Sequence, residues 1–310
     1  MRVLVTGGNG FLGSFVSKRL KASGKYEVLT FGSRDFDLTS QESTNQLFST
    51  HNPDQVIHLA ARVGGIGANK ANPGKFAYDN LIMGTNLIET ARRYNTKKVV
   101  IAGTICAYPK HTPVPFNESQ LWNGYPEETN APYGLAKKML LVLAQGYRQQ
   151  YGSNFVYVLP VNLYGPRDNF DLETSHVIPA MIRKFHQAKV ARIPVVTLWG
   201  DGSPTREFLY VEDCAEAFVA VLERYDQMHP MNIGSGQEIS MRDLAETIRS
   251  VVGYPGAVAW DTTRPNGQPR RCLDTSMAEQ TINWKASTKL HEGLHRTYEW
   301  FLNQQDAKSP

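Results

Sequence analysis

The sequence predicts an α/β protein in which helices cover both faces of a doubly wound parallel sheet, with a smaller α+β lobe in the C-terminal half. Three observations support this fold. Short apolar segments alternate with amphipathic segments through the first half of the chain. The apolar segments are almost entirely hydrophobic, which is typical of strands buried on both faces. A cluster of glycines, from Gly7 to Gly13, directly follows the first apolar segment.

The expected elements alternate in order along the first half. We expect strands at residues 1–6, 26–31, 55–60, 98–102 and 154–159. We expect helices between them, at residues 11–22, 41–49, 80–94 and 133–151. A helical crossover returns each strand parallel to the one before it, so the sheet is expected to be parallel.

The second half has a different character. Loops rich in Pro, Gly and Asn separate shorter elements there, at residues 164–173, 200–204 and 262–269. This pattern suits a smaller lobe that closes over the ends of the strands. We therefore expect one domain at 1–165, which also receives a returning segment near 207–226, and a second lobe at 166–310.

Composition excludes several classes of protein. The formal net charge is +4 and there is no dense Lys/Arg run, so nucleic acid is not an expected partner, and an anionic small molecule is weakly favoured. The three cysteines, Cys106, Cys214 and Cys272, are widely spaced, which argues against a disulfide framework or a zinc site, and we expect no metal. No apolar run approaches the roughly 20 residues of a membrane span, and the N-terminus does not resemble a signal peptide. We expect a cytoplasmic protein.

The glycine cluster predicts a dinucleotide site. Gly7, Gly10 and Gly13 are spaced Gly-x-x-Gly-x-x-Gly between the first strand and the first helix. One glycine makes the tight turn, one lets the backbone approach a pyrophosphate, and one lets the helix pack on the strand. The N–H groups at the helix N-terminus then face the phosphates. An ordinary strand–helix turn is the alternative, but the position of the cluster favours a Rossmann-type cofactor site.

The end of the second strand bears on which dinucleotide binds. An acidic residue there usually binds the ribose hydroxyls of NAD. Here the strand runs into Gly32-Ser33-Arg34-Asp35. Arg34 can pair with a 2′-phosphate through its planar fork of donors, whereas Asp35 can still serve the ribose. We expect NADP rather than NAD.

Tyr133 and Lys137 form a predicted catalytic pair. Four residues apart on a helix, their side chains point toward the same space. A nearby ammonium stabilises a phenolate, so we expect the pKa of Tyr133 to be lowered from its usual value of about 10. Lys137 can also hold the nicotinamide ribose. Thr104, at the end of the fourth strand, can orient a substrate carbonyl with its hydroxyl.

Together these residues resemble the extended short-chain dehydrogenase/reductase family. A narrower resemblance, to the GDP-L-fucose synthase family, covers essentially the whole chain. The stretches that carry it are 60–66, 106–110, 162–170, 175–180, 199–209, 265–270 and 298–302. The blocks around Cys106 and His176 are the specific ones, because other dehydratases and 4-epimerases of this fold are not expected to carry both.

The resemblance implies an NADPH-dependent conversion of GDP-4-keto-6-deoxy-D-mannose to GDP-L-fucose. Cys106 and His176 would exchange the protons at C3 and C5, since both types of side chain titrate near neutrality. Tyr133 would protonate the C4 oxygen after hydride transfer, and with Thr104 it would hold the enolate oxygen. The alternatives are a GDP-sugar 3,5- or 3-epimerase without net reduction, a related 4-keto-sugar-nucleotide reductase, or a non-catalytic NADP-binding protein.

Binding residues and assembly are also implied by the resemblance. Substrate would contact Lys184, Trp199, Arg206 and Asn266; Lys184 stands where Arg is common, and Asn266 where Asp is frequent. A homodimer would form through the helix of Tyr133 and the helix before it. NADP(H) would contact Gly7, Gly10, Phe11, Leu12, Gly13, Arg34, Asp37, Leu38, Leu59, Ala60, Ala61, Ala102, Gly103, Lys137, Pro160, Asn162, Leu163 and His176.

Overall fold

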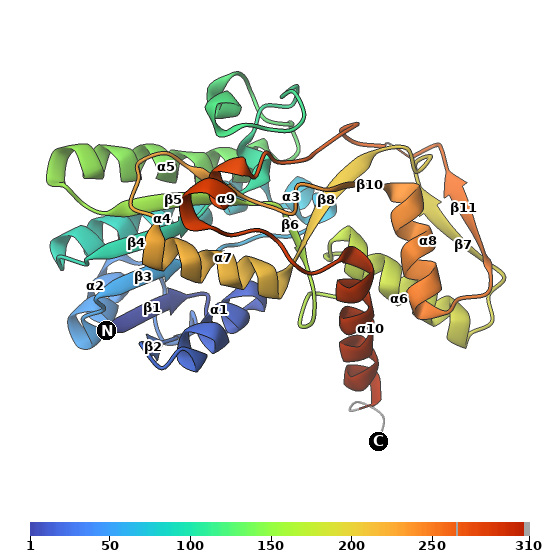
Figure 1. Cartoon of the computed structure of the whole chain (residues 1–310), viewed down its shortest axis with the longest axis horizontal. Helices are drawn as coiled ribbons and strands as arrows, with labels where there is room; N and C mark the ends of the chain where they lie inside the picture. The colour runs from blue at the N-terminus through green and yellow to red at the C-terminus, as the bar shows by residue number, and fades with distance from the viewer. Residues whose placement is uncertain (265, 307–310) are drawn as a thin grey trace.

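The computed structural model describes residues 1–264 and 266–306, so Pro265 of the stretch 265–270 lies outside the described residues. Its larger part is a six-stranded parallel sheet with the order β2-β1-β3-β4-β5-β9 (Figure 1). The strands are β1 (Arg2–Thr6), β2 (Glu27–Leu29), β3 (Gln55–His58), β4 (Lys98–Ala102), β5 (Phe155–Pro160) and β9 (Met231–Ile233). Strand order reverses beside β1, and in such sheets ligands bind where it does so. The predicted parallel, doubly wound sheet is confirmed.

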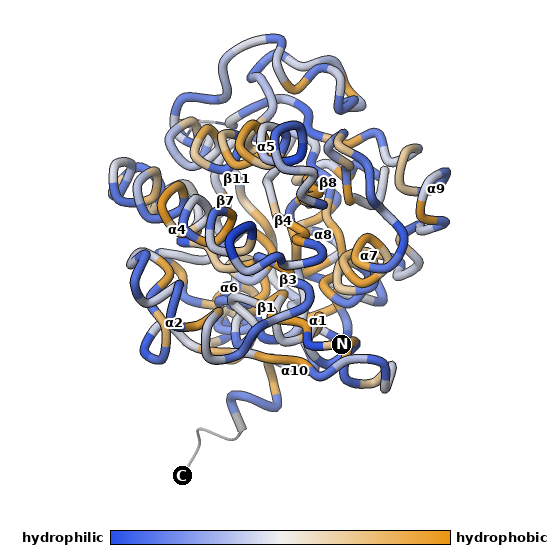
Figure 2. The backbone as a smooth tube through the Cα atoms, turned by 90° about the vertical axis from the view of Figure 1, so that its left-hand side faces the viewer, coloured by the Kyte–Doolittle hydropathy of each residue, from blue (hydrophilic) through white to orange (hydrophobic). Residues whose placement is uncertain are grey.

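Helices cover both faces of this sheet, as Figure 2 shows. On one face lie α2 (Gln41–His51), α4 (Pro73–Arg93) and α5 (Ala131–Tyr151). On the other lie α1 (Phe11–Ala22) and α7 (Val211–Arg224), which pack against each other. With helices on both sides, every residue of β4 is buried, which explains its continuous apolar sequence.

The second lobe has a core of its own, built around side chains such as Phe185, Tyr254 and Leu294. It contains a three-stranded sheet, β10-β8-β6, and a two-stranded parallel sheet, β11-β7. Their bounds are β6 (Asn162–Tyr164), β7 (Val195–Trp199), β8 (Thr205–Tyr210), β10 (Glu238–Ser240) and β11 (Ala257–Asp261). The helices of this lobe are α6 (Val177–Val190), α8 (Met241–Val252) and α10 (Leu290–Asp306).

The chain returns to the first core more often than the sequence predicts. Besides α7, the edge strand β9 belongs to the large sheet, and α9 (Ser276–Ile282) contacts both of them. Leu273 and Trp284, on either side of α9, are buried in the same core. These returning pieces are short, so no apolar periodicity in the sequence distinguishes them.

Some predicted boundaries differ from the structure. The helix expected at 80–94 begins at Pro73, because proline is well tolerated in a first helical turn. The strand expected at 26–31 pairs only over Glu27–Leu29. Within residues 1–159, three further short elements were not predicted: α3 (Ile66–Ala71), η1 (Ile105–Ala107) and η2 (Glu118–Trp122). Across the described part of the chain, no helix is both long and apolar enough to cross a membrane.

Candidate active site

A cavity of about 1490 Å³ opens at the carboxyl ends of β1, β3 and β4 and extends into the second lobe. All five predicted catalytic residues line it: Thr104, Cys106, Tyr133, Lys137 and His176. The residues expected to bind the sugar nucleotide also line it: Lys184, Trp199, Arg206 and Asn266. Of the residues expected to contact the cofactor, these line it as well: Gly7, Gly10, Phe11, Leu12, Gly13, Asp37, Leu38, Leu59, Ala60, Ala61, Ala102, Gly103, Pro160, Asn162 and Leu163.

The glycine loop forms one end of the cavity, and its packing leaves no room for a side chain at Gly7 or Gly13. Gly7 has φ +69°, and a Cβ there would lie 2.9 Å from the backbone nitrogen of Ala60. A Cβ on Gly13 would lie only 2.0 Å from the carbonyl oxygen of Gly7. Helix α1 begins at Phe11 without a side-chain cap, so the N–H groups of its first turn are available to a ligand. This loop fits the pyrophosphate of a dinucleotide.

Three charged residues follow β2, namely Arg34, Asp35 and Asp37, and only Asp37 lines the cavity. Asp35 accepts a hydrogen bond from the Gly32 nitrogen at 2.8 Å and so closes its own turn. Asp37 accepts bonds from the backbone and hydroxyl of Thr39, which lower the pKa of its carboxyl, and it lines the cavity. Arg34 is exposed and is not part of the lining.

Close packing of α5 on η1 brings three predicted catalytic residues together. A Cβ on Gly134 would lie 2.4 Å from the carbonyl oxygen of Cys106, so only glycine permits this approach. Thr104 caps η1 by accepting a hydrogen bond from the Cys106 nitrogen at 3.2 Å. The hydroxyl of Thr104 is also hydrogen-bonded to the side chain of Tyr133. The turn after β4 and the start of α5 therefore form one site.

The electrostatics of Tyr133 correct the prediction from sequence. We expected Lys137 to lower the pKa of Tyr133, but burial, assisted by the nearby Cys106, raises that pKa well above 10. Burial also lowers the pKa of Lys137 to about 8. Loss of hydration disfavours the charged form of both side chains. Tyr133 is therefore a protonated phenol at neutral pH, which suits a proton donor.

His176 reaches the cavity from the second lobe. It is the N-cap residue of α6, and its side chain is exposed and lines the cavity. Partial loss of hydration within the cavity lowers the pKa of His176 below its usual value of 6.5. The imidazole is therefore neutral near pH 7 and can accept a proton.

The end of the cavity within the second lobe is cationic. Arg206 of β8 is half-buried, and burial followed by the charge of Arg271 lowers its pKa to about 10, so it stays protonated at neutral pH. Lys184 comes from α6, and Trp199, which is 67 % exposed, ends β7. Asn266 accepts a hydrogen bond from the Asp201 nitrogen at 2.9 Å and so holds the loop after Trp199. Such a surface is suited to an anionic ligand with a flat ring.

Several lining residues were not identified from the sequence. They include Asn69, Glu127, Arg264, Gln268 and Arg271. The guanidinium carbon of Arg264 lies 5.3 Å from the centre of the Trp199 ring, and Arg271 Nη1 lies 3.8 Å from Cys106 Sγ. A signal for the last three existed, because they lie in or beside the stretch 265–270. Asn69 and Glu127 have no such signal.

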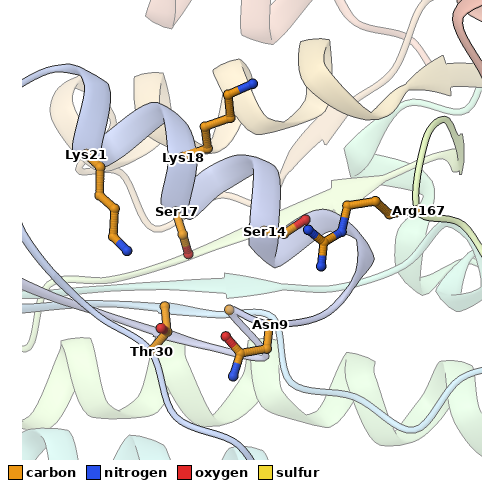
Figure 3. A pocket seen from close by; sticks show the side chains of 8 residues that line it. Asn9, Ser14, Ser17, Lys18, Lys21, Thr30 and Arg167 are labelled. Atoms are coloured by element: carbon orange, nitrogen blue, oxygen red, sulfur yellow. The ribbon is translucent and has the colours of Figure 1, made fainter. Parts of the chain in front are cut away.

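A smaller pocket of about 550 Å³ lies beside α1 (Figure 3). Its lining includes Lys18, Lys21 and Arg167, with serines of the same helix. Figure 3 shows that Lys18 and Lys21 extend from α1 in different directions, so these cations do not converge on one point.

All three cysteines are free thiols. Within residues 1–264 and 266–306, no group of three His, Cys, Asp or Glu side chains is placed to hold a metal ion.

Comparison with known proteins places this geometry in context. Residues 3–234 match the model of the NAD dependent epimerase/dehydratase family. The chain is 43 % identical to a GDP-L-fucose synthase of Sinorhizobium fredii, covering 97 % of this chain and 96 % of the relative. It is 39 % identical to the GDP-L-fucose synthase of Escherichia coli, covering 98 % of each. A solved GDP-L-fucose synthetase of Naegleria fowleri bound to NADP superposes with a TM-score of 0.91 at 28 % identity, covering 98 % and 95 % of the two chains.

Proposed function

Because the chain belongs to the NAD dependent epimerase/dehydratase family and resembles its GDP-L-fucose synthases over nearly its whole length, we propose that it converts GDP-4-keto-6-deoxy-D-mannose to GDP-L-fucose. The observation that carries this proposal is the single cavity. It unites a dinucleotide loop, Tyr133 with Lys137, Cys106 with His176, and a cationic end. A 4-reductase that inverts neither carbon needs Tyr133 and Lys137 but not Cys106 and His176.

The first two steps invert C3 and C5. The C4 ketone acidifies the hydrogens on both carbons, and removal of either produces an enolate. Cys106 and His176 exchange these protons, one removing and the other returning a proton from the opposite side of the sugar. Thr104 and Tyr133 donate hydrogen bonds to the enolate oxygen, so one oxyanion site serves both inversions. The lowered pKa of His176 supports this role, because it leaves the ring neutral near pH 7.

The last step reduces C4. The cofactor is NADP(H), and when bound as NADPH it supplies hydride to C4. Tyr133 then donates its proton to the C4 oxygen, and its raised pKa ensures that this proton is present at neutral pH. Lys137 stabilises the phenolate that remains and holds the nicotinamide ribose. The glycine loop binds the pyrophosphate, and Asp37 lies at the adenosine end. Arg34 is exposed outside the cavity lining, next to the lining residue Ser33, and would pair with the 2′-phosphate from there.

The substrate lies toward the second lobe. Arg206 and Lys184 bind the diphosphate, Trp199 provides an apolar wall, and Asn266 orients the loop that carries it. We accordingly assign NADP binding to the domain at 1–165, with returning pieces, and sugar-nucleotide binding to 166–310. The cationic side chains in the second lobe support this division.

Two further proposals concern the state of the protein. We propose a homodimer through α4 and α5, which would pair as a four-helix bundle. Large apolar side chains on these helices support it: Tyr78, Leu81, Met139 and Val142 are exposed in the monomer. We also propose that the enzyme acts in the cytoplasm, and the three free cysteines support a reducing compartment.

The test is to incubate the protein with NADPH and GDP-4-keto-6-deoxy-D-mannose and to assign the ring stereochemistry of the product by NMR. GDP-L-fucose with one NADPH oxidised per product supports the proposal. A product that keeps the ketone would identify an epimerase without net reduction. Reduction without inversion would identify a 4-reductase, and no turnover would favour a non-catalytic NADP-binding protein.

A further inference from the structure

We propose that Arg271 is a further catalytic residue, whose guanidinium pairs with the thiolate of Cys106 and keeps this side chain ready to accept a proton. The inference rests on the proposed function, because it concerns the base of the same reaction. It assigns Arg271 to the proton-transfer step, in addition to any attraction it exerts on the anionic substrate.

The contact between the two side chains is direct. Arg271 Nη1 lies 3.8 Å from Cys106 Sγ, within hydrogen-bonding range for sulfur. Both residues are half-buried and line the cavity, so water screens the interaction less than at the open surface. A guanidinium stays protonated throughout the physiological range, and a cation beside a thiol favours the thiolate, which is the reactive form.

The arginine is held in place by its neighbours. Its Nε donates to Oε1 of Gln268, and the Nε2 of Gln268 donates to the carbonyl oxygen of Lys110 at 2.6 Å. Gln268 is buried, so this link between the second-lobe loop and the segment after η1 is shielded from solvent. One edge of the guanidinium is therefore fixed, which leaves Nη1 to face the sulfur.

The backbone that follows Arg271 is anchored as well. The Leu273 nitrogen donates to Oε2 of Glu207 at 2.7 Å, and Glu207 is fully buried. The Phe116 nitrogen donates to the carbonyl oxygen of Cys272 at 2.8 Å. The segment that carries Arg271 is thus attached both to β8 and to the first domain. The tertiary structure therefore fixes Arg271 beside Cys106, as it would not fix a free side chain on the surface.

Other charged groups near the pair are consistent with this role. The Cys106 thiol acts on the phenol of Tyr133 and raises its pKa, so a thiolate would reinforce the protonated state of Tyr133. Arg206 lies close enough for the charge of Arg271 to lower its pKa, and Glu238 acts on Arg206 in the opposite sense. In this cationic region, Cys106 Sγ is the acceptor that Arg271 Nη1 faces.

The step is balanced without any additional reactant. The thiolate takes a proton from C3 or C5 of the keto sugar, forming an S–H bond as the C–H bond breaks. The electron pair of that C–H bond becomes the enolate, whose oxygen is held by Thr104 and Tyr133. Nothing is oxidised or reduced. Inversion is completed when His176, after taking a proton from solvent, donates it to the same carbon from the opposite side of the sugar, and Cys106 then loses its proton to solvent.

The test measures alkylation of Cys106 at pH 7 with iodoacetamide, a neutral reagent whose local concentration does not depend on the arginine charge. Cys214 and Cys272 are buried, and the Cys106→Ser variant gives the background. We expect Arg271→Met to slow alkylation about fivefold and Arg271→Lys, which retains a charge, to restore most of the rate. The matched control is Arg270→Met, which removes an exposed charge that is paired with Glu238 and lies outside the cavity lining.

Arg271→Met that folds, as judged by thermal denaturation, and alkylates at the wild-type rate would overturn the inference. If the Met variant does not fold, wild-type alkylation by Arg271→Gln, which also lacks the charge, would overturn the inference. A rise in KM for the GDP-sugar with unchanged alkylation would assign Arg271 to substrate binding alone. Alkylation requires no turnover, so it can support the contact even if the proposed reaction fails, and it can refute the contact while the reaction stands.

Discussion

The two ends of the cavity differ in how far apart along the chain their residues lie. At the cofactor end, the loop from Gly7 to Gly13 forms within a few residues and works through its backbone. At the substrate end, Lys184, Arg206 and Arg271 come from α6, β8 and the loop before α9, and they work through charged side chains. An atom added to a tightly packed glycine of the loop therefore disrupts several ligand contacts at once. Loss of one side chain at the substrate end removes only the contacts of that side chain.

The largest effect is expected at the cofactor end, from Gly13→Ala. The new Cβ would lie 2.0 Å from the Gly7 carbonyl oxygen, and backbone cannot move aside as a flexible side chain can. Several N–H contacts to phosphate would be lost together, so NADPH affinity should fall by at least about a hundredfold. Fluorescence titration with NADPH measures this.

Gly74→Ala is the control for that change. A Cβ at Gly74, in the first turn of α4, meets nothing within 4 Å. We expect its NADPH affinity to be unchanged and its free energy of unfolding to shift by less than about 1 kcal/mol. Comparable losses in both variants would show that the tight packing at Gly13 is not the cause.

Cys106→Ser should slow proton transfer to and from the sugar without weakening binding at either end of the cavity. A serine hydroxyl is a much poorer base than a thiol, so deuterium exchange at C3 and C5 should fall about a thousandfold. NADPH affinity should be unchanged, because Cys106 lies outside the glycine loop. NMR of the keto sugar in heavy water follows the exchange, and wild-type exchange by this variant would refute the role of Cys106.

Arg206→Met should weaken the substrate end alone. Loss of one charge-assisted contact to phosphate should raise KM for the GDP-sugar about thirtyfold, with NADPH affinity unchanged. Arg249→Met is the matched control, because Arg249 lies on α8 of the same lobe, pairs with Glu246 and does not line the cavity. If KM rises equally in the two variants, general electrostatics rather than a diphosphate contact explains the effect.

The smallest effect concerns pH. Burial lowers the pKa of His176, so its neutral, proton-accepting form persists to lower pH than that of an ordinary histidine. The acid limb of kcat/KM for epimerisation should therefore have its midpoint below about pH 6.5 and should be absent in His176→Asn. A pH profile of deuterium exchange checks this, and a midpoint above 6.5 would contradict it.

Much of this molecule could be predicted from sequence because the relevant signals are local. Continuous apolar segments indicated the parallel sheet, and glycine spacing after β1 indicated the loop that the structure shows. Tyr133 and Lys137 could be paired because helical periodicity alone places them on one face. The electrostatic prediction for Tyr133 was wrong, because the degree of burial is not encoded in that spacing.

The amino-acid sequence by itself determined the sheet, the position of the glycine loop, and which side chains are able to carry protons. These depend on the residue types and on contacts over a few positions. Only the tertiary structure decided that Arg271 faces Cys106, that Gly134 lets α5 reach η1, and that β9 and α9 return to the first core. Each of these contacts joins residues far apart along the chain, and their proximity depends on packing that no local pattern specifies.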